Sequence, residues 1–384
     1  MTQKLLLVSD SASCHSGLGR ITRDLATRIH ADLPEFEVAT AGFGGPGNKD
    51  FGWPEYHFHE LNNFMPPELP MICQDFAGDE ELIVLCIWDP SRLRWFANPD
   101  QCPMPMMRQW LKVANIRKWI YAPIDAEGPN GKLSVRLQES LAGFERVLNY
   151  SKWSAGVTGY PDFIPHGLDT EAWRPRDKSE AKKVLGELGF HGLKETDFLV
   201  GMVATNQARK NYALGIQTCR ILLERGLDVK VWVHIDSLER HWNIISLVED
   251  YGLQGRVMIT TSNFTDMQMR YMYSACNVTL GIGLGEGFGY PIFESMLCGT
   301  PCVHGNYGGA AEHLPSWMKV DPIPYAWFYE SPYCNKRPVY LPEQWAAKAE
   351  EAAENPDIAD INALELDWSK VWPKFKSWLK AGLR

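Results

Sequence analysis

The sequence has little that would direct it into a membrane or an oxidising compartment. No apolar run is long enough to cross a bilayer, and the apolar stretch 5–8 near the start is too short for the core of a signal peptide. The nine cysteines are scattered, odd in number and without a CxxC pair, which disfavours both a disulfide framework and a zinc site. We therefore expect reduced thiols in a cytoplasmic protein that holds no metal.

Positive charge is also scarce. The chain has 47 acidic and 38 basic residues, so its formal net charge is −9. Nucleic-acid partners usually require a basic surface, and this balance disfavours such a partner without excluding it. One part of the first half does gather cations, which fit either a solvated surface or a local contact with an anionic partner. These cations are Arg92, Arg94, Arg108, Lys112, Arg117, Lys118, Lys132 and Arg136.

Short apolar runs alternate with helix-like stretches along most of the chain. The runs that we predict as strands are 4–8, 37–41, 82–88, 119–123 and 146–150, then 198–203, 229–235, 257–260, 278–282 and 301–304. Residues 43–80 are rich in glycine, proline and aromatic residues and are expected to form loops. Strands that alternate with helices predict parallel sheets with helices on both faces.

The alternation occurs in two blocks, and 384 residues suffice for two domains. We predict an α/β protein with two Rossmann-like domains, 1–165 and 166–365, followed by an amphipathic helix within 366–384 that packs on the body. Ligands of such sheets bind beyond the carboxyl ends of the strands. The glycine-rich loops of both domains are therefore expected at a cleft between the domains.

The first such loop is Ser16-Gly17-Leu18-Gly19-Arg20, directly after the first predicted strand. It places backbone amides at the start of a helix, where an anion is favoured. The loop is not the dinucleotide fingerprint GxGxxG. It fits either a phosphate contact through Gly17 and Gly19 or a plain turn between strand and helix.

A pair of cations, Arg209-Lys210, follows the predicted strand 198–203. Arginine binds phosphate oxygens through two parallel hydrogen bonds, and lysine adds a point charge. Such a pair can stabilise a departing nucleoside diphosphate, which a divalent metal does in other enzymes. An exposed helix start is the alternative, but cations there oppose the helix dipole.

The most specific segment is Gly285-Glu286-Gly287-Phe288-Gly289-Tyr290-Pro291-Ile292-Phe293-Glu294-Ser295-Met296. Gly287 and Gly289 let backbone amides approach a ligand closely, and Pro291 suits the first turn of a helix. The pattern therefore predicts that a helix begins between Glu286 and Glu294. Amides at that helix start favour a phosphate, and the two carboxylates can hold sugar and ribose hydroxyls.

This segment resembles the E-x7-E signature of retaining GT-B glycosyltransferases, and glycosyltransferase family 4 (group 1) is the most similar class. Three further segments resemble motifs of that family, and together the matches cover residues 160–313. They are Ile164-Pro165-His166-Gly167-Leu168-Asp169 (like "IPNGVD"), Arg209-Lys210-Asn211 (like its phosphate clamp) and Gly308-Gly309 with Glu312. The first half matches only in its glycine loop and its order of strands and helices.

The resemblance implies a GT-B fold, with the donor in the C-terminal domain, the acceptor in the N-terminal domain and the last helix crossing back to the N-terminal domain. It implies that Arg209 and Lys210 hold the diphosphate of a nucleoside-diphosphate (NDP) sugar, and that Gly17 and Gly19 approach its phosphates. Glu286 would hold the donor sugar and Glu294 the ribose. The amides of Gly287, Phe288 and Gly289 would contact sugar or phosphate, and Thr261 and Ser262 the base. No metal or other cofactor is implied, and no convincing DxD is present.

The chain departs from the family's usual pattern at two positions that would take part in the reaction. Many members have Gly-Arg before the clamp, where this chain has Ala204-Thr205, so one cation of the usual set is absent. Many also have a histidine in the N-terminal domain near the reacting carbon, where this chain has Asp125 at the end of a predicted strand. Asp125 is either a base that orients or deprotonates the acceptor hydroxyl or an ordinary loop acid.

Three functions stay open at this point. The first is a retaining glycosyltransferase, whose acceptor is a glycan, a lipid-linked sugar, a small molecule or a hydroxylated base in DNA. The second is an NDP-sugar epimerase of the same fold, which would convert the donor without an acceptor. The third is a nucleotide-binding module without catalysis, which the presence of both glutamates and both cations disfavours.

Overall fold

The computed structural model describes residues 2–45, 50–59, 65–261, 264–355 and 365–383. The chain divides into two units, each built around its own six-stranded sheet. The N-terminal unit comprises Met1–His166, Glu330–Asn335 and Ser369–Arg384, and the C-terminal unit comprises Gly167–Tyr329 and Lys336–Trp368. None of the described helices is long and apolar enough to cross a membrane.

The sheet of the N-terminal unit is parallel throughout, with the strand order β3-β2-β1-β4-β5-β6. Leucines and valines fill both faces of its central strands, which are buried on both sides as expected for a parallel sheet. The strands are β1 (Gln3–Asp10), β2 (Phe36–Phe43), β3 (Glu55–Phe58), β4 (Leu82–Cys86), β5 (Ile116–Ala122) and β6 (Arg146–Asn149).

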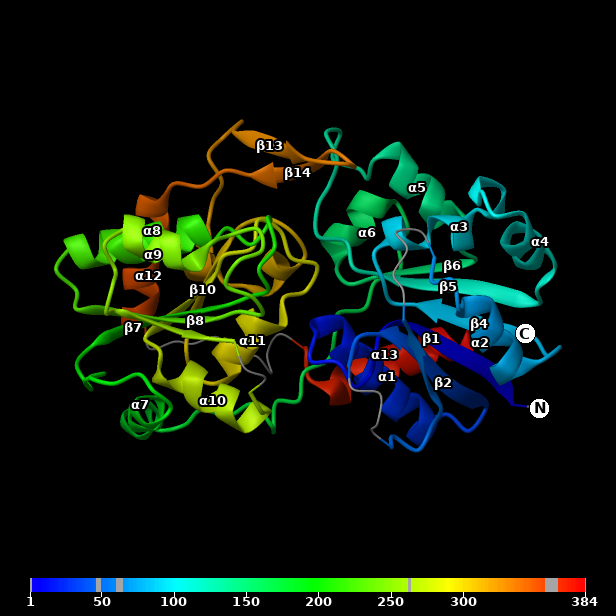
Figure 1. Cartoon of the computed structure of the whole chain (residues 1–384), viewed down its shortest axis with the longest axis horizontal. Coiled ribbons are helices and arrows are strands. Elements are labelled where there is room, and N and C mark those ends of the chain that lie inside the picture. Colours follow the sequence, from blue (N-terminus) through cyan, green and yellow to red (C-terminus); the bar gives the residue numbers. More distant parts are fainter. Residues whose placement is uncertain (1, 46–49, 60–64, 262–263, 356–364, 384) are drawn as a thin grey trace. The chain divides into compact units, whose positions relative to one another are not determined.

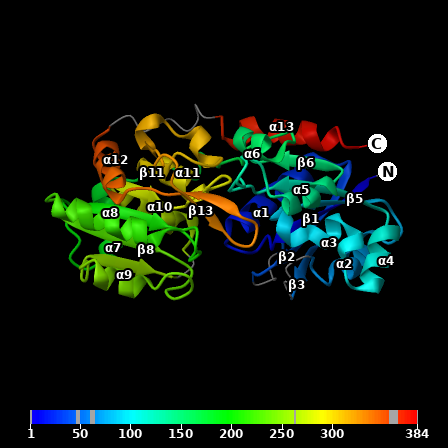
Figure 2. The ribbon, with the colours of Figure 1, turned by 90° about the horizontal axis from the view of Figure 1, so that it is seen from above.

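Helices cover both faces of this sheet (Figures 1 and 2). One face packs against α2 (Leu69–Ala77), α3 (Arg94–Ala97), α4 (Pro105–Val113) and α5 (Val135–Ala142). On the other face lie α1 (Gly17–Asp32) and the last helix, α13 (Trp368–Lys380). Trp378 and Phe375 of α13 pack edge-on against Trp119 and Tyr121 of β5. The amphipathic helix predicted at the end of the sequence therefore buries its aromatic face on the N-terminal sheet.

The sheet of the C-terminal unit repeats the pattern, with the order β12-β11-β10-β7-β8-β9 and parallel pairing throughout. The strands are β7 (Phe198–Val203), β8 (Val229–His234), β9 (Val257–Thr260), β10 (Val278–Gly281), β11 (Cys302–Gly305) and β12 (Lys319–Val320). A separate two-stranded hairpin consists of β13 (Trp327–Glu330) and β14 (Asn335–Pro338).

Two helical layers enclose this second sheet (Figure 1). On one face lie α8 (Tyr212–Glu224), α9 (Ile244–Asp250) and α12 (Pro342–Glu354), and on the other α7 (Lys178–Glu187), α10 (Asp266–Ala275) and α11 (Tyr290–Leu297). The remaining helical segments are α6 (Lys152–Thr158), η1 (Pro90–Leu93), η2 (Pro99–Gln101), η3 (Ala310–His313) and η4 (Ser316–Met318).

The predicted Rossmann-like alternation is confirmed, and most strand bounds differ from the predicted ones by a few residues. The prediction of loops over residues 43–80 was wrong, because β3 and α2 lie there. Strand β3 is a short edge strand that is only half-buried, so it lacks the continuous apolar run of a central strand. Helix α2 lies between short glycine- and proline-containing segments, which conceal its buried apolar face in the sequence.

Candidate functional site

In both sheets the strand order changes direction beside the first strand of the unit. In the N-terminal unit this switch point lies between β1 and β4, and in the C-terminal unit between β7 and β10. Open parallel sheets bind ligands at such points, beyond the carboxyl ends of the strands. In the C-terminal unit, the loop after β7 carries Arg209 and Lys210, and the loop after β10 carries Glu286. The topology therefore brings the predicted clamp and the predicted sugar-binding glutamate to one place.

A short backbone ladder joins these two loops. The Asn211 amide donates to the Ile282 carbonyl at 3.1 Å, and the Leu284 amide donates to the Arg209 carbonyl at 2.8 Å. Between these two bonds, Lys210 and Gly283 form an antiparallel bridge. The ladder fixes the register of the two loops, so the cations lie beside the segment that leads into Glu286.

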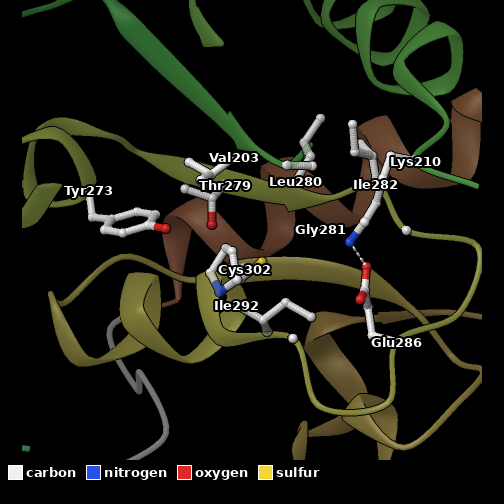
Figure 3. Close-up of a pocket in the computed structure, with 14 residues that line it drawn as sticks. Val203, Lys210, Tyr273, Thr279, Leu280, Gly281, Ile282, Glu286, Ile292 and Cys302 are labelled. Carbon is white, nitrogen blue, oxygen red and sulfur yellow. Dashed lines mark hydrogen bonds and ion pairs between the residues drawn. The ribbon is translucent and has the colours of Figure 1, made fainter. Parts of the chain in front are cut away.

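Both cations contact the same carboxylate oxygen. Lys210 Nζ donates to Glu286 Oε1, and Arg209 Nη1 lies 3.2 Å from that oxygen. Arg209 Nη1 also donates to the Gly285 carbonyl at 3.0 Å, which ties the guanidinium to the glycine-rich loop. In Figure 3 the Lys210 amine and the Glu286 carboxylate point toward each other across the pocket rim.

The Glu286 carboxyl group stays ionised in this position. Glu286 is only 8% exposed, and burial alone raises the pKa of a carboxyl group. The positive charges of Lys210 and Arg209 outweigh burial and lower the pKa of Glu286 to about 2. The group is therefore an anion at every pH at which the protein is expected to work, and it is no candidate for a general acid.

Two glycines shape the space around this carboxylate. A Cβ atom at Gly283 would lie 2.1 Å from Glu286 Oε1, so only glycine leaves room for the oxygen there. Gly308, with φ +90°, lies against the Glu286 backbone, and the nearby Ala310 amide donates to the Glu286 carbonyl at 3.2 Å. Gly283 was not predicted as a site residue, although it lies in the glycine-rich run of residues 281–285 at the end of β10.

Helix α11 begins as predicted, between the two glutamates. Gly289 adopts φ 88° as the residue before the helix, a backbone conformation that glycine tolerates best, and Pro291 lies in the first turn. Glu294 follows one turn later and is 7% exposed. The Tyr273 hydroxyl of α10 donates to Glu294 Oε2 at 3.0 Å, a partner that no sequence spacing indicated.

A pocket in the C-terminal unit lies between Lys210, Glu286 and Tyr273 (Figure 3). Its polar lining comes from Lys210, Glu286, Tyr273 and Thr279, and its apolar lining from β7, β10 and the start of α11. Lys210 and Glu286 stand on one side in Figure 3, and Tyr273 and Thr279 on the other. The pocket thus combines a charged side with an apolar floor, as ligand pockets commonly do.

One buried histidine near this pocket was missed. His304 of β11 is fully buried, and its ring Nδ1 is 2.5 Å from the Gly281 carbonyl, to which it donates. Burial lowers the pKa of His304, although the Glu286 carboxylate acts in the opposite direction. The neutral ring therefore adds no positive charge to the site, and the cations next to Glu286 are supplied by Arg209 and Lys210.

The other donor-binding candidates of the C-terminal unit lie at the same edge of the sheet or close to it. Gly287 is buried. The centroids of the Phe288 and Phe293 rings lie 4.7 Å apart in the core, so Phe288 offers only its backbone to a ligand. Thr261 is exposed directly after β9. Ser262 lies outside the described residues.

The remaining candidates lie in the N-terminal unit, also after strands. Gly17 is exposed and starts α1, whose cap is the Ser16 hydroxyl. The Gly19 amide donates to that hydroxyl at 3.0 Å, and Ser16 Oγ donates to Asp10 Oδ2 at 2.5 Å. Asp125 is half-buried in the loop after β5. The structure thus places these three residues at the carboxyl edge of their own sheet.

Gly19 has a packing role of its own, and its replacement is expected to cost stability. A Cβ at this position would lie 2.6 Å from the Ser11 carbonyl oxygen and 2.8 Å from that of Cys14. Because backbone atoms cannot yield as flexible side chains do, we expect Gly19→Ala to lower the free energy of unfolding by about 1–3 kcal/mol in urea titrations. Gly186→Ala in α7 is the matched control, since open space surrounds that position. An unchanged stability of Gly19→Ala would contradict the packing role.

Comparison with known proteins identifies the part of the chain that carries this site. Residues 187–317 match the family model of the glycosyl transferases group 1. Over this stretch the chain is similar to the group 1 glycosyl transferases. The stretch includes Arg209, Lys210, Glu286 and Glu294, which are the residues of the clamp and of the E-x7-E segment.

Curated proteins that are similar to this chain have transferase names. A serotype-specific mannosyltransferase, WbdA of Escherichia coli, is 38% identical over 74 residues, which are 19% of this chain and 9% of that protein. A D-inositol 3-phosphate glycosyltransferase of Rhodococcus opacus is 22% identical over 236 residues, 58% of this chain and 51% of that protein. The chain thus spans about half the length, or less, of these curated relatives.

Solved structures show the same fold over nearly the whole chain. HepE of Anabaena in complex with UDP and glucose has a TM-score of 0.69 and 14% identity, and the match covers 99% of this chain and 100% of HepE. Sucrose-phosphate synthase of Thermosynechococcus elongatus has a TM-score of 0.66 and 15% identity, with 99% and 98% covered. The two units have the two-domain Rossmann-like architecture of GT-B glycosyltransferases, as the resemblance implied.

Proposed function

We propose that this chain is a retaining glycosyltransferase that moves a sugar from an NDP-sugar to an acceptor hydroxyl. The observation that carries the proposal is the meeting of Arg209, Lys210 and Glu286 at the switch point of the C-terminal sheet, within the stretch that matches the group 1 family model. The names of the curated relatives support a transferase. Neighbours of the same fold bind UDP or UDP-glucose, which supports an NDP-sugar as donor.

The residues of the C-terminal unit take distinct roles in this proposal. Arg209 and Lys210 bind the diphosphate, and Glu286 accepts hydrogen bonds from hydroxyls of the donor sugar. Glu294, one helical turn inside α11, accepts from the ribose, while the amides of Gly287 and Gly289 contact sugar or phosphate. Thr261 and Ser262 contact the base. In the N-terminal unit, Gly17 and Gly19 approach the phosphates and Asp125 binds the acceptor hydroxyl.

The proposed reaction breaks the bond between the anomeric carbon and the diphosphate oxygen, and the acceptor oxygen bonds to that carbon on the same face. The acceptor proton passes to the departing diphosphate, which also takes the electron pair of the broken bond. Negative charge therefore grows on the diphosphate in the transition state, where the guanidinium and the ammonium stabilise it. Positioning and this electrostatic term supply most of the barrier reduction.

The two cations supply the charge that a divalent metal supplies in other transferases, so we propose that turnover needs no metal. Transfer rates in excess EDTA are then expected to equal those in buffer containing magnesium. A loss of transfer in EDTA that added magnesium restores would contradict metal independence, while leaving the sugar-transfer proposal in place.

The function itself is tested with UDP-, GDP- and ADP-sugars. Nucleotide binding to the folded protein raises the apparent melting temperature, so a thermal-shift screen identifies the donor. The preferred donor is then incubated with a panel of hydroxylated acceptors and, separately, alone. Transfer to an acceptor supports the proposal. Conversion of the donor sugar in the absence of acceptor would indicate an epimerase, and absence of any nucleotide binding would contradict the proposal.

A further inference from the structure

The arrangement of Arg209, Lys210 and Glu286 has a consequence for the ligand that the cations bind. Lys210 Nζ donates to Glu286 Oε1 and Arg209 Nη1 forms an ion pair with the same oxygen at 3.2 Å, so a protein carboxylate lies beside the cations that the proposed function assigns to a diphosphate. The group is largely shielded from water, with side chains of Glu286 and Lys210 only 11% and 14% exposed. Charge-assisted hydrogen bonds in such surroundings are stronger than those at an open surface.

The pairing is built into the backbone of the two loops. The ladder from Arg209 to Asn211 and from Ile282 to Leu284 holds the loops together. Gly283 leaves the space in which the carboxylate oxygen lies, and Gly308 lies against the Glu286 backbone. The glutamate is thus positioned as an internal counter-ion of the clamp.

A diphosphate that binds this clamp has to share or replace the contacts that Lys210 and Arg209 make with Glu286. Glu286 and the diphosphate carry the same sign of charge, so each disfavours the other beside the cations. A buried carboxylate that loses its cationic partners also needs new hydrogen-bond donors, because a buried charge without them is costly. The hydroxyls of a donor sugar are such donors, whereas an NDP that lacks the sugar brings none to this position.

We propose that Glu286 is a counter-ion that the sugar of the donor must release from the clamp, and that it thereby sets the preference for NDP-sugar over NDP. The inference rests on the proposed function and extends it to substrate selection. The charge of Glu286 weakens the binding of a bare NDP, which speeds the release of the product after transfer. The sugar hydroxyls compensate Glu286 in the complete donor, so the donor does not suffer the same loss.

The experiment measures dissociation constants by calorimetry for pyrophosphate, UDP, GDP and ADP, and for the preferred NDP-sugar. The variant is Glu286→Gln, which keeps the shape and removes the charge. We expect pyrophosphate and the cognate NDP to bind about tenfold more tightly to Glu286→Gln, an effect of the size of one charge-assisted hydrogen bond. The NDP-sugar is expected to gain nothing or to bind more weakly. Glu249→Gln, at an exposed glutamate of α9, makes the same change in net charge and is expected to leave all affinities unchanged.

A second variant keeps the test valid if Glu286→Gln folds poorly. Gly283→Ala keeps the charge but moves the Glu286 oxygen away from its place beside Lys210, and it is also expected to tighten the binding of pyrophosphate. Equal or weaker binding of NDP and pyrophosphate to Glu286→Gln, with normal binding to the wild type, would overturn the counter-ion role alone. Absence of binding to the wild type would overturn the proposed function, and the inference with it.

Discussion

Replacing Lys210 by alanine is expected to lower the rate of sugar transfer by about 10²–10³-fold, the usual effect of removing one donor that stabilises a developing negative charge. Arg209→Ala is expected to have an effect of the same order. Lys210 Nζ donates to Glu286 Oε1 and Arg209 Nη1 lies 3.2 Å from the same oxygen, and in the proposed reaction the diphosphate gains charge beside these two cations as the sugar leaves. Because this charge is larger in the transition state than in the bound donor, kcat should fall more than donor affinity.

The controls distinguish the loss of a positive charge at the clamp from the loss of a positive charge elsewhere on the protein. Arg240 of the same unit pairs with Asp236 on the surface, with 59% of its side chain exposed, so Arg240→Ala should transfer at the wild-type rate. Arg209→Lys retains the charge and loses the planar fork, and an intermediate rate is expected. Circular dichroism and thermal melts confirm that each variant is folded. Wild-type rates in both Lys210→Ala and Arg209→Ala would contradict the assignment of the clamp.

Replacing Glu294 by glutamine is expected to raise the dissociation constant of the NDP-sugar by about 10–100-fold, the range for loss of a charged hydrogen-bond acceptor. Glu294 is buried in the second turn of α11, where its carboxylate accepts from the Tyr273 hydroxyl, and the proposed function assigns the same carboxylate to the ribose hydroxyls. The change should act on binding more than on kcat, because the ribose takes no part in bond breaking. Calorimetry with the donor and steady-state kinetics measure the two effects.

Pyrophosphate provides the control for this second prediction. It has no ribose, so its affinity is expected to be the same in the wild type and in Glu294→Gln. Tyr273→Phe keeps the ring and the charge of Glu294 but removes the hydroxyl that orients it, and a weaker loss of donor affinity is expected. Equal losses for pyrophosphate and the NDP-sugar would show that Glu294→Gln disturbs the whole pocket, and would contradict a specific contact with the ribose.

Much of the fold was predictable because burial on both faces leaves a clear signal. The strand Phe198–Val203 is apolar or small at every position and was predicted with its observed bounds. The hairpin of β13 and β14 gave no such signal, since its strands have four residues each and only Arg337 and Pro338 in them are buried. Helix α12, which buries Trp345 against the C-terminal sheet, was also not predicted, because its face is made mostly of alanines among charged residues.

In the candidate site, too, some features were predictable from the local sequence and others depend on the fold. Glu286, Gly289, Pro291 and Glu294 stand within nine residues, so their local order could be read as a turn followed by a helix start. The pairing of Lys210 with Glu286 joins positions 76 residues apart, and it depends on β7 and β10 being neighbours in the sheet. Tyr273 and Gly283 owe their importance to contacts that no local spacing encodes. Sequence patterns therefore predicted the groups, and the sheet topology supplied their partners.

The most direct test of the central claim is the anomeric configuration of the transferred sugar. Nuclear magnetic resonance of the product distinguishes the two configurations through the coupling between the anomeric proton and its neighbour, for sugars such as glucose in which the coupling differs. From an α-linked NDP-sugar, the retaining mechanism predicts an α-linked product, which forms about 10²–10³-fold more slowly in Lys210→Ala. A β-linked product would contradict the retaining mechanism, and failure to transfer any sugar from a bound donor would contradict the proposed function.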